Sequence, residues 1–246
     1  MKTLIIGDLH GRSIWKDIIT QHNNIERIIF LGDYFDSFDI SAAEQIHNFK
    51  EIIKLKESCT YEIILLIGNH DHHYLKEVGN TGTSGYQHNN ALEIITIIEQ
   101  YKKYLQVAYK FENILCTHAG VGKVFLDYVF GKQGWSIENI DTELNALFKI
   151  QPRAFIFSGF NPNGDDIGQT PLWIRPKSLK MDSVDFKKKL IQVVGHTQMI
   201  QIPSTASTDG RYYFIDTLGT SKEYLVVTAG KIDLFSLTKH HTVLPR

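Results

Sequence analysis

LIIGDLHG, residues 4–11, joins an apolar run typical of a strand to side chains that bind metal ions. Four later stretches have the same design: IFLGDYFD (29–36), LLIGNHD (65–71), LCTHAG (115–120) and VVGHT (193–197). Together they supply six candidate metal ligands: Asp8, His10, Asp33, Asn69, His118 and His196. Carboxylate, imidazole and amide groups suit divalent cations such as Mn, Fe or Zn, and a carboxylate between two ligand sets suits a bridge. The repeated design therefore predicts a binuclear metal site.

Short β-branched runs alternate with segments of helical period in the first half of the chain, which indicates β-α-β units and a partly parallel sheet. We expect strands at 3–7, 27–31 and 62–67 and helices at 13–22 and 41–56. Ser41 is the expected N-cap of the second helix, and Glu44 completes a capping box. Open α/β sheets bind ligands at the carboxyl ends of their strands, so the candidate ligands should gather at one edge.

The rest of the chain is less regular. The glycine-rich stretch 72–90 predicts a loop or cap before a helix at 91–103, so 72–104 is the expected cap or lid insertion. A helical region at 121–150 should break at 131–135, and 151–180 is expected to wind over the surface near the site. The expected later strands are 105–110, 113–117, 190–194, 212–215, 224–228 and 231–236, the last two forming an antiparallel hairpin.

Composition limits the alternatives. The chain has 246 residues and is 43% hydrophobic, which predicts one domain, residues 1–246, with a substantial core. Its 26 basic and 27 acidic residues balance, so no extended nucleic-acid surface is expected, and Lys187–Lys189 is interpreted as a short solvated run. Cys116 lies in an apolar run and should be a buried thiol rather than part of a disulfide framework. No apolar run approaches the length of a signal or a membrane span, so we expect a cytoplasmic protein without a membrane partner.

A pair of cations suits the hydrolysis of phosphate esters. Two ions about 3.5 to 4 Å apart supply a hydroxide near neutral pH and offset charge on the phosphoryl oxygens. Asp33 is the expected bridge between them. Asp8 and His10 are expected on one ion and the other ligands on the second: Asn69, His118 and His196.

The motifs resemble the signature of the calcineurin-like metallophosphoesterase superfamily, which runs D-x-H, G-D-x-x-D, G-N-H-D/E, H and G-H. The resemblance spans residues 5–216 and is strongest to the phosphoprotein phosphatase branch, which includes phage and bacterial serine/threonine phosphatases and diadenosine tetraphosphate hydrolases. Ile215-Asp216-Thr217 matches an Asp-Thr pair of that branch, and Gln198 stands where many phosphodiesterases have a second histidine. The resemblance implies an α/β fold, a four-layer αββα sandwich of two mixed sheets flanked by helices.

The resemblance also implies roles for residues beyond the ligands. His70 would be the general acid that protonates the leaving alkoxide, paired with Asp36, and a carboxylate partner would raise its pKa and fix its tautomer. Asn69 would contact the substrate as well as a metal ion. The branch usually has an arginine where this chain has Ser37, so that phosphate contact is missing. Arg175, in Pro171-Leu-Trp-Ile-Arg175, resembles a second arginine that binds the phosphate in prokaryotic members.

These observations predict a phosphomonoesterase that uses a metal-bridging hydroxide and two divalent ions, Mn first and Fe, Zn or Ni as alternatives. Phosphoserine or phosphothreonine proteins and dinucleoside polyphosphates are the candidate substrates, with a phosphodiesterase as the alternative activity. A non-catalytic scaffold, as in the retromer subunit that resembles this superfamily, is the other class. Retention of all six ligands with His70 and Asp36 favours an enzyme. The sequence leaves the oligomeric state open.

The residues around the third motif have weaker predictions. Asp71 is expected to cap or anchor the following turn, and His72 and His73 are interpreted as solvated loop residues. The aromatic side chains of the next loop could form a partial lid that stacks on a base: Tyr74, Tyr86 and His88.

Overall fold

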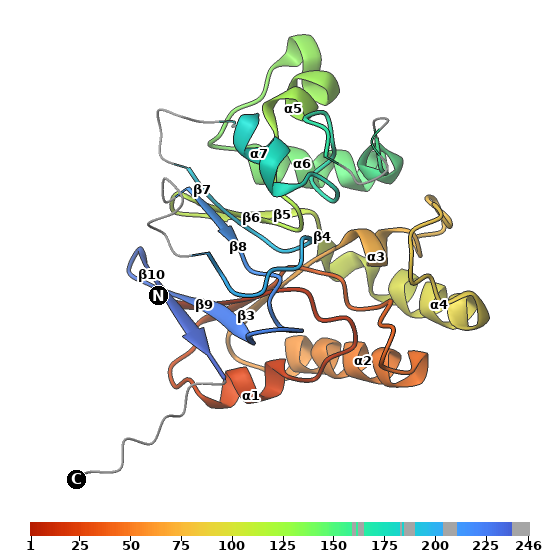
Figure 1. The fold of residues 1–246 in the computed structure, drawn as a ribbon, viewed down its shortest axis with the longest axis vertical. Helices are drawn as coiled ribbons and strands as arrows, with labels where there is room; N and C mark the ends of the chain where they lie inside the picture. The colour runs from red at the N-terminus through yellow and green to blue at the C-terminus, as the bar shows by residue number, and fades with distance from the viewer. Residues whose placement is uncertain (159–160, 162–164, 183, 185–189, 204–210, 238–246) are drawn as a thin grey trace.

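The computed structural model describes residues 1–158, 161, 165–182, 184, 190–203 and 211–237. Lys187–Lys189 lies outside the described residues. Two mixed sheets lie face to face between layers of helices, which confirms the predicted fold class (Figure 1). No helix among the described residues combines the length and apolar character that a membrane span requires.

The first sheet has six strands. Their spatial order is β10 (Lys231–Ser236), β9 (Glu223–Thr228), β1 (Lys2–Ile6), β2 (Arg27–Phe30), β3 (Glu62–Leu66) and β4 (Leu105–Gln106). Strands β1 to β4 run parallel, whereas β9 pairs antiparallel with both β1 and β10. The predicted C-terminal hairpin is therefore present, and it completes the sheet beside the first strand of the chain.

The second sheet has four strands among the described residues, in the order β5 (Ala108–Phe111), β6 (Ile114–Thr117), β7 (Ile191–Val194) and β8 (Tyr212–Phe214). Only the β5–β6 pair is antiparallel in this part of the sheet. Residues 105–110, expected as one strand, instead contribute to both sheets. The chain crosses between them at Val107, where Asn145 Oδ1 accepts hydrogen bonds from the backbone N–H groups of Val107 (2.9 Å) and Ala108 (3.1 Å).

Helices cover the outer face of each sheet (Figure 1). On the side of the first sheet lie α1 (Trp15–Thr20), α2 (Ala42–Ser58) and α4 (Ala91–Tyr101), and on the side of the second lie α5 (Lys123–Phe130), α6 (Ile140–Ile150) and α7 (Pro176–Met181). The single turn α3 (Asn69–His72) follows β3. Short 3-10 turns occur at His88–Asn90, Lys102–Tyr104, Gly131–Gln133 and Pro152–Phe155. The predicted capping box is present, since Ser41 Oγ accepts from the Glu44 N–H and Glu44 Oε2 accepts from the Ser41 N–H.

Alternation along the strands divides the core into layers. Ile5 and Ile29 point toward the second sheet and pack with Cys116, which is fully buried as predicted. Leu4 and Ile6 point the other way and join the core beneath the helices. Both faces of these strands are buried, so the polar residues that follow them have one open direction, which is the carboxyl edge of the sheet.

Candidate metal centre

The candidate ligands lie at the carboxyl ends of strands from both sheets. Asp8 follows β1, Asp33 follows β2 and Asn69 begins α3 directly after β3. His118 follows β6 and His196 follows β7, in the second sheet. Because the two sheets pack face to face, these ends meet, and the structure brings all six predicted ligands into one cluster.

Asp33 stands at the centre of the cluster. Its Oδ2 lies 3.6 Å from His10 Nε2 and 3.5 Å from His118 Nε2, one imidazole on either side. Its Oδ1 accepts the backbone N–H of His70 at 2.9 Å. This hydrogen bond fixes the carboxylate with one oxygen between two ligand sets, which is the geometry that a bridging role requires.

The second predicted ligand set converges on a single point. Asn69 Oδ1 lies 2.8 Å from His118 Nε2 and 3.0 Å from His196 Nδ1. The other nitrogen of each ring faces a backbone carbonyl, Leu31 O for His118 and Trp173 O for His196, at 2.9 and 3.1 Å. Carbonyl oxygens accept only, so those nitrogens carry the proton, and the nitrogens that face Asn69 present lone pairs when the rings are neutral. A cation is the partner that such converging lone pairs fit.

His10 is oriented in the same way. Its Nδ1 lies 2.9 Å from Phe35 O, so its Nε2 faces Asp33 as a lone pair in the neutral ring. All three candidate imidazole ligands therefore have a tautomer suited to metal binding. Burial is the largest influence on their pKa values and lowers each of them, which keeps the rings neutral.

Asp8 supplies a separate test of whether a metal ion fits. Its Oδ2 accepts the backbone N–H of His196 at 2.8 Å, but its Oδ1 is buried and has no hydrogen-bond partner among the described residues. A Cβ on Gly195 would lie only 1.8 Å from this oxygen, so the close approach requires glycine. Burial, followed by the charges of Asp216 and Asp33, raises the pKa of Asp8. An unpartnered carboxylate oxygen beside Asp33 and His118 fits a bound cation.

The backbone at the site is held in an uncommon conformation. Four of the eight described non-glycine residues with positive φ belong to it: His10 (43°), Asp33 (53°), Asp36 (64°) and His196 (63°). Such residues cost free energy, and they persist where surrounding contacts fix them. Asp71 supplies such contacts around Asp33, accepting from the N–H groups of Asp33 and Tyr34 at 2.7 Å and of Gly68 at 2.9 Å. Asp71 thus caps the turn α3 through the Gly68 N–H, as expected, and it also joins this turn to the end of the neighbouring strand β2.

His70 differs electrostatically from the candidate ligands. Burial lowers its pKa, but the charge of Asp33 and the hydrogen bond and charge of Asp36 outweigh burial and raise the pKa to about 8. Burial raises the pKa of Asp33, but attraction to the protonated forms of His118, His70 and His10 outweighs burial and lowers it. His70 is therefore the imidazole of this cluster that carries a proton near neutral pH.

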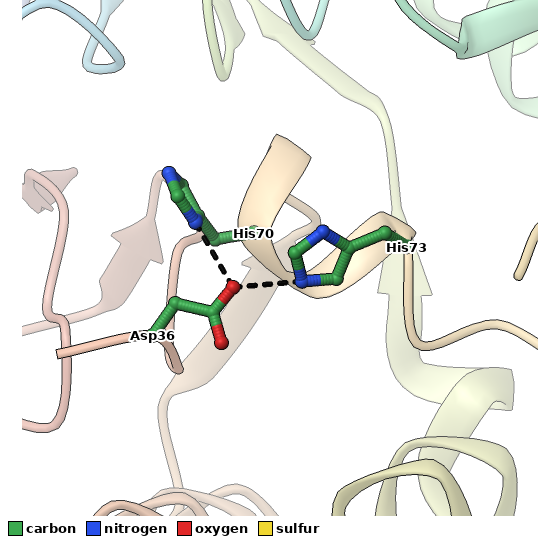
Figure 2. Close-up of side chains that lie close together, drawn as sticks. All are labelled: Asp36, His70 and His73. Carbon is green, nitrogen blue, oxygen red and sulfur yellow. Dashed lines mark hydrogen bonds and ion pairs between the residues drawn. The ribbon is translucent and has the colours of Figure 1, made fainter. Parts of the chain in front are cut away.

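Asp36 joins His70 to residues whose importance the sequence did not reveal (Figure 2). Its Oδ2 accepts from His70 Nδ1 at 3.0 Å and lies 2.7 Å from His73 Nε2, while its Oδ1 accepts from Tyr74 Oη at 2.5 Å. The His73 contact is close but lacks the alignment of a hydrogen bond. His70 and His73 are three residues apart on one helical turn, so both can face the same carboxylate.

His72 and His73 are buried, and their interpretation as solvated loop residues was wrong. His72 Nε2 lies 2.8 Å from Pro152 O, and burial lowers its pKa to about 4. Tyr74 is also fully buried and stacks on Tyr86, so it is not available to stack on a base. Burial of this turn follows from its tight connection to β3, which places its side chains inside the molecule.

Arg175 and Ser37 border the site. Arg175 lines the two pockets that contain candidate ligands, and it donates to Thr197 Oγ1 at 3.2 Å. Ser37 is buried, and its hydroxyl accepts from the backbone N–H groups of Asp39 and Ile40 at 3.3 and 3.2 Å. Arg12 also lines the site, although the sequence analysis did not select it. Its position two residues after His10 was the available signal.

Comparison with known proteins identifies the fold and the family. A family model for the calcineurin-like phosphoesterases matches residues 1–199. The chain belongs to this family. The predicted resemblance is thereby confirmed, and this calcineurin-like phosphoesterase is a metal-dependent hydrolase of phosphoric esters. A search of curated protein sequences gives no match.

Solved structures share the fold of this calcineurin-like phosphoesterase at low sequence identity. The cold-active protein-tyrosine phosphatase of the psychrophile Shewanella sp. has a TM-score of 0.59 and 18% identity, with 95% of this chain and 77% of that chain covered. A protein serine/threonine phosphatase from Saccharomyces cerevisiae, with similarity to human PP5, has a TM-score of 0.55 and 15% identity, with 98% and 81% covered.

Proposed function

We propose that this calcineurin-like phosphoesterase is a binuclear phosphomonoesterase. The observation that carries the proposal is the division among its imidazoles: three neutral rings aim lone pairs into the cluster, while His70 beside them has a pKa of about 8. Metal ligands must be neutral, and a general acid must carry a proton. One cluster thus meets both requirements.

In this proposal the six residues hold two divalent ions: Asp8, His10, Asp33, Asn69, His118 and His196. Manganese is our first choice and Fe, Zn or Ni the alternatives, since mixed nitrogen and oxygen donors suit ions of intermediate softness. Two bound cations would activate water near neutral pH and offset charge on the phosphoryl oxygens. Asp33 Oδ2, with an imidazole on either side, is the proposed bridge.

The chain's own residues supply the remaining chemistry. Asp36 fixes the proton of His70 on Nδ1, and the protonated ring offers its Nε2–H to the leaving oxygen of the ester. Arg175 is the proposed phosphate contact, because a guanidinium can donate two parallel hydrogen bonds to phosphate oxygens, and Asn69 is the second proposed substrate contact. The name of the yeast structure supports a phosphoserine or phosphothreonine substrate, and that of the Shewanella structure supports phosphotyrosine.

The proposed domain organisation is a single unit with a lid. Helix α4 packs into the core through Ile94, Ile97 and Ile98, so the part of 72–104 that borders the site is residues 81–84. We propose these four residues as the lid element, and a cytoplasmic location.

Metal content tests the binuclear proposal. The wild-type protein should bind about two equivalents of Mn and hydrolyse p-nitrophenyl phosphate, whereas Asp33→Asn should bind less than one and lose turnover, because one carboxylate serves both ions. Asp233→Asn, on the edge strand β10, removes the same charge away from the cluster and should match the wild type. Two equivalents of Mn retained by Asp33→Asn in elemental analysis would show that Asp33 is not the bridge.

A further inference from the structure

Asp36, His70 and His73 bring together three side chains of the types that bind metal ions, and none of them is among the six candidate ligands of the metal centre (Figure 2). One ligand atom from each residue lies within 4.8 Å of the other two. Asp36 Oδ2 lies 3.0 Å from His70 Nδ1 and 2.7 Å from His73 Nε2, so one carboxylate oxygen stands between the two imidazoles. These three side chains are called the second cluster below.

His73 is the member of the second cluster that the proposed proton transfer does not use. Its side chain is 1% exposed, and neither ring nitrogen has a hydrogen-bond partner among the described residues. A neutral imidazole has one N–H and one lone pair, and burial of both without partners costs free energy. Tyr74 and Tyr86 pack against the ring in T-shaped geometry, with centroid distances of 4.5 and 4.8 Å. The ring is therefore held against Asp36 although no hydrogen bond fixes it there.

The contact between His73 and Asp36 suits a shared cation better than a direct hydrogen bond. A hydrogen bond requires the N–H to point at the oxygen, and this contact of 2.7 Å lacks that alignment. In a metal site the nitrogen and the oxygen both point at the ion beside them, and not at each other. Two imidazoles and one carboxylate form the protein ligand set of some zinc sites, in which water or a substrate takes the fourth position. The second cluster therefore fits zinc.

A cation can reach the second cluster from solvent. Asp36 and His70 line a pocket of about 290 Å³ that also opens onto the candidate metal centre. His73 does not line this pocket, so it would bind the ion from the buried side. The pocket would then supply the water for the fourth position.

We propose that Asp36, His70 and His73 form an inhibitory zinc site. Its effect on catalysis rests on the proposed function, in which His70 is the general acid, whereas the binding of zinc does not. A zinc ion on His70 Nδ1 takes the place of the proton that now faces Asp36, and this proton is released to water. The zinc-bound ring would have to become an imidazolate to give its Nε2 proton to the leaving oxygen. Such a ring is a much weaker acid than an imidazolium, so bound zinc should stop the proton transfer.

Zinc content tests the site independently of catalysis. After saturation with Zn and gel filtration, the wild type should retain about three equivalents, two at the metal centre and one at the second cluster, and His73→Gln about one fewer. His72→Gln is the matched control, because it removes an equally buried imidazole from the same turn and its amide can still donate to Pro152 O. Its zinc content should equal that of the wild type. Equal zinc content in His73→Gln and the wild type by elemental analysis overturns the site.

Kinetics of the Mn-loaded protein test the effect on His70, with each rate compared with that of the same protein before Zn is added. Added Zn should lower kcat of the wild type about tenfold or more on phosphoserine peptides, and less on p-nitrophenyl phosphate, whose leaving group needs little protonation. This difference between the substrates should persist in His72→Gln and disappear in His73→Gln. Exchange of Mn for Zn at the metal centre would affect all three proteins alike. Inhibition that is equal on both substrates, or equal in the wild type and His73→Gln, overturns the inhibitory role.

The two measurements separate this inference from the proposed function. If the wild type hydrolyses neither ester, the proposed function fails, and a zinc content about one equivalent higher in the wild type than in His73→Gln still supports the site. Circular dichroism establishes that each variant is folded. His73→Phe, which keeps a ring between Tyr74 and Tyr86, replaces His73→Gln in both measurements if that variant unfolds.

Discussion

Asp36→Asn tests the assignment of His70 as the proton donor, because it removes a charge and keeps the shape of the side chain. The amide oxygen introduced by this substitution can still accept a hydrogen bond from His70 Nδ1, so the ring should keep its position. The pKa of His70 should fall, since the hydrogen bond and charge of Asp36 are two of the causes that raise it to about 8. We expect a fall of about one unit, equivalent to about 1.4 kcal/mol.

The pH dependence gives the size of the expected loss of kcat in Asp36→Asn. A general acid must be protonated, so kcat is lost as the pH rises through the pKa of His70. At pH 8.5 about a quarter of His70 is protonated with a pKa of 8, and about 3% with a pKa of 7, which predicts a loss of kcat of about eightfold. At pH 6 both forms are almost fully protonated, so little loss is expected there.

The assay is kcat for a phosphoserine peptide between about pH 6 and 9.5, with p-nitrophenyl phosphate in parallel. The basic limb should move down by about one pH unit on the peptide and change less on the nitrophenyl ester, whose leaving group needs little protonation. Asp233→Asn serves as the charge control. An unmoved basic limb, or an equal loss at every pH on both esters, would refute the assignment of His70 as the acid.

His70→Ala should bind as much metal as the wild type, measured by elemental analysis. Its kcat should fall roughly 10²- to 10⁴-fold on phosphoserine peptides and less on p-nitrophenyl phosphate. Equal losses on both substrates would contradict the role of His70 as the acid. Arg175→Ala should lower kcat/KM for phosphomonoesters by a factor worth about 1.5 to 3 kcal/mol, with partial recovery in Arg175→Lys, and unchanged steady-state kinetics would exclude it as the phosphate contact. Gly195→Ala should destabilise the protein by about 1 to 3 kcal/mol in thermal unfolding and reduce Mn binding, because a Cβ would collide with Asp8 Oδ1. Ser37→Arg would place an arginine where the family usually has one. Because the buried hydroxyl of Ser37 caps a turn, we expect this variant to have a lower melting temperature. A variant that is more active and equally stable would show that the turn does not need this cap.

The parts of the site that could be predicted are those encoded locally. Each candidate ligand lies shortly after the end of an apolar strand, and the carboxyl ends of neighbouring parallel strands must meet. The positions of Asp8 and His10 depend only on the first strand. The contact of His196 with Asp8 requires only that the second sheet pack on the first. These features depend on the hydrophobic period of each strand and on the order of the motifs along the chain, and both can be read from the sequence.

The parts that could not be predicted depend on contacts between distant segments. Asp71 accepts from backbone groups 37 and 38 residues away, and His73 reaches Asp36 only because α3 forms a helical turn. The crossing at Val107 likewise depends on Asn145, from another helix. A histidine or aspartate in a polar stretch looks solvated in the sequence, and only tertiary packing shows that its side chain is enclosed.

The position of β1 in the middle of the first sheet has a consequence for how the molecule is made. Lys2 pairs with Thr228 and Leu4 with Val226, so β1 waits until β9, far along the sequence, has been synthesised before its second edge is covered. Contacts of such sequence separation slow folding, and an uncovered apolar strand is prone to pair with other chains. A nascent or truncated chain that ends before β9 should therefore depend on chaperones, because the strand that precedes Asp8 and His10 then lacks one of its two partners.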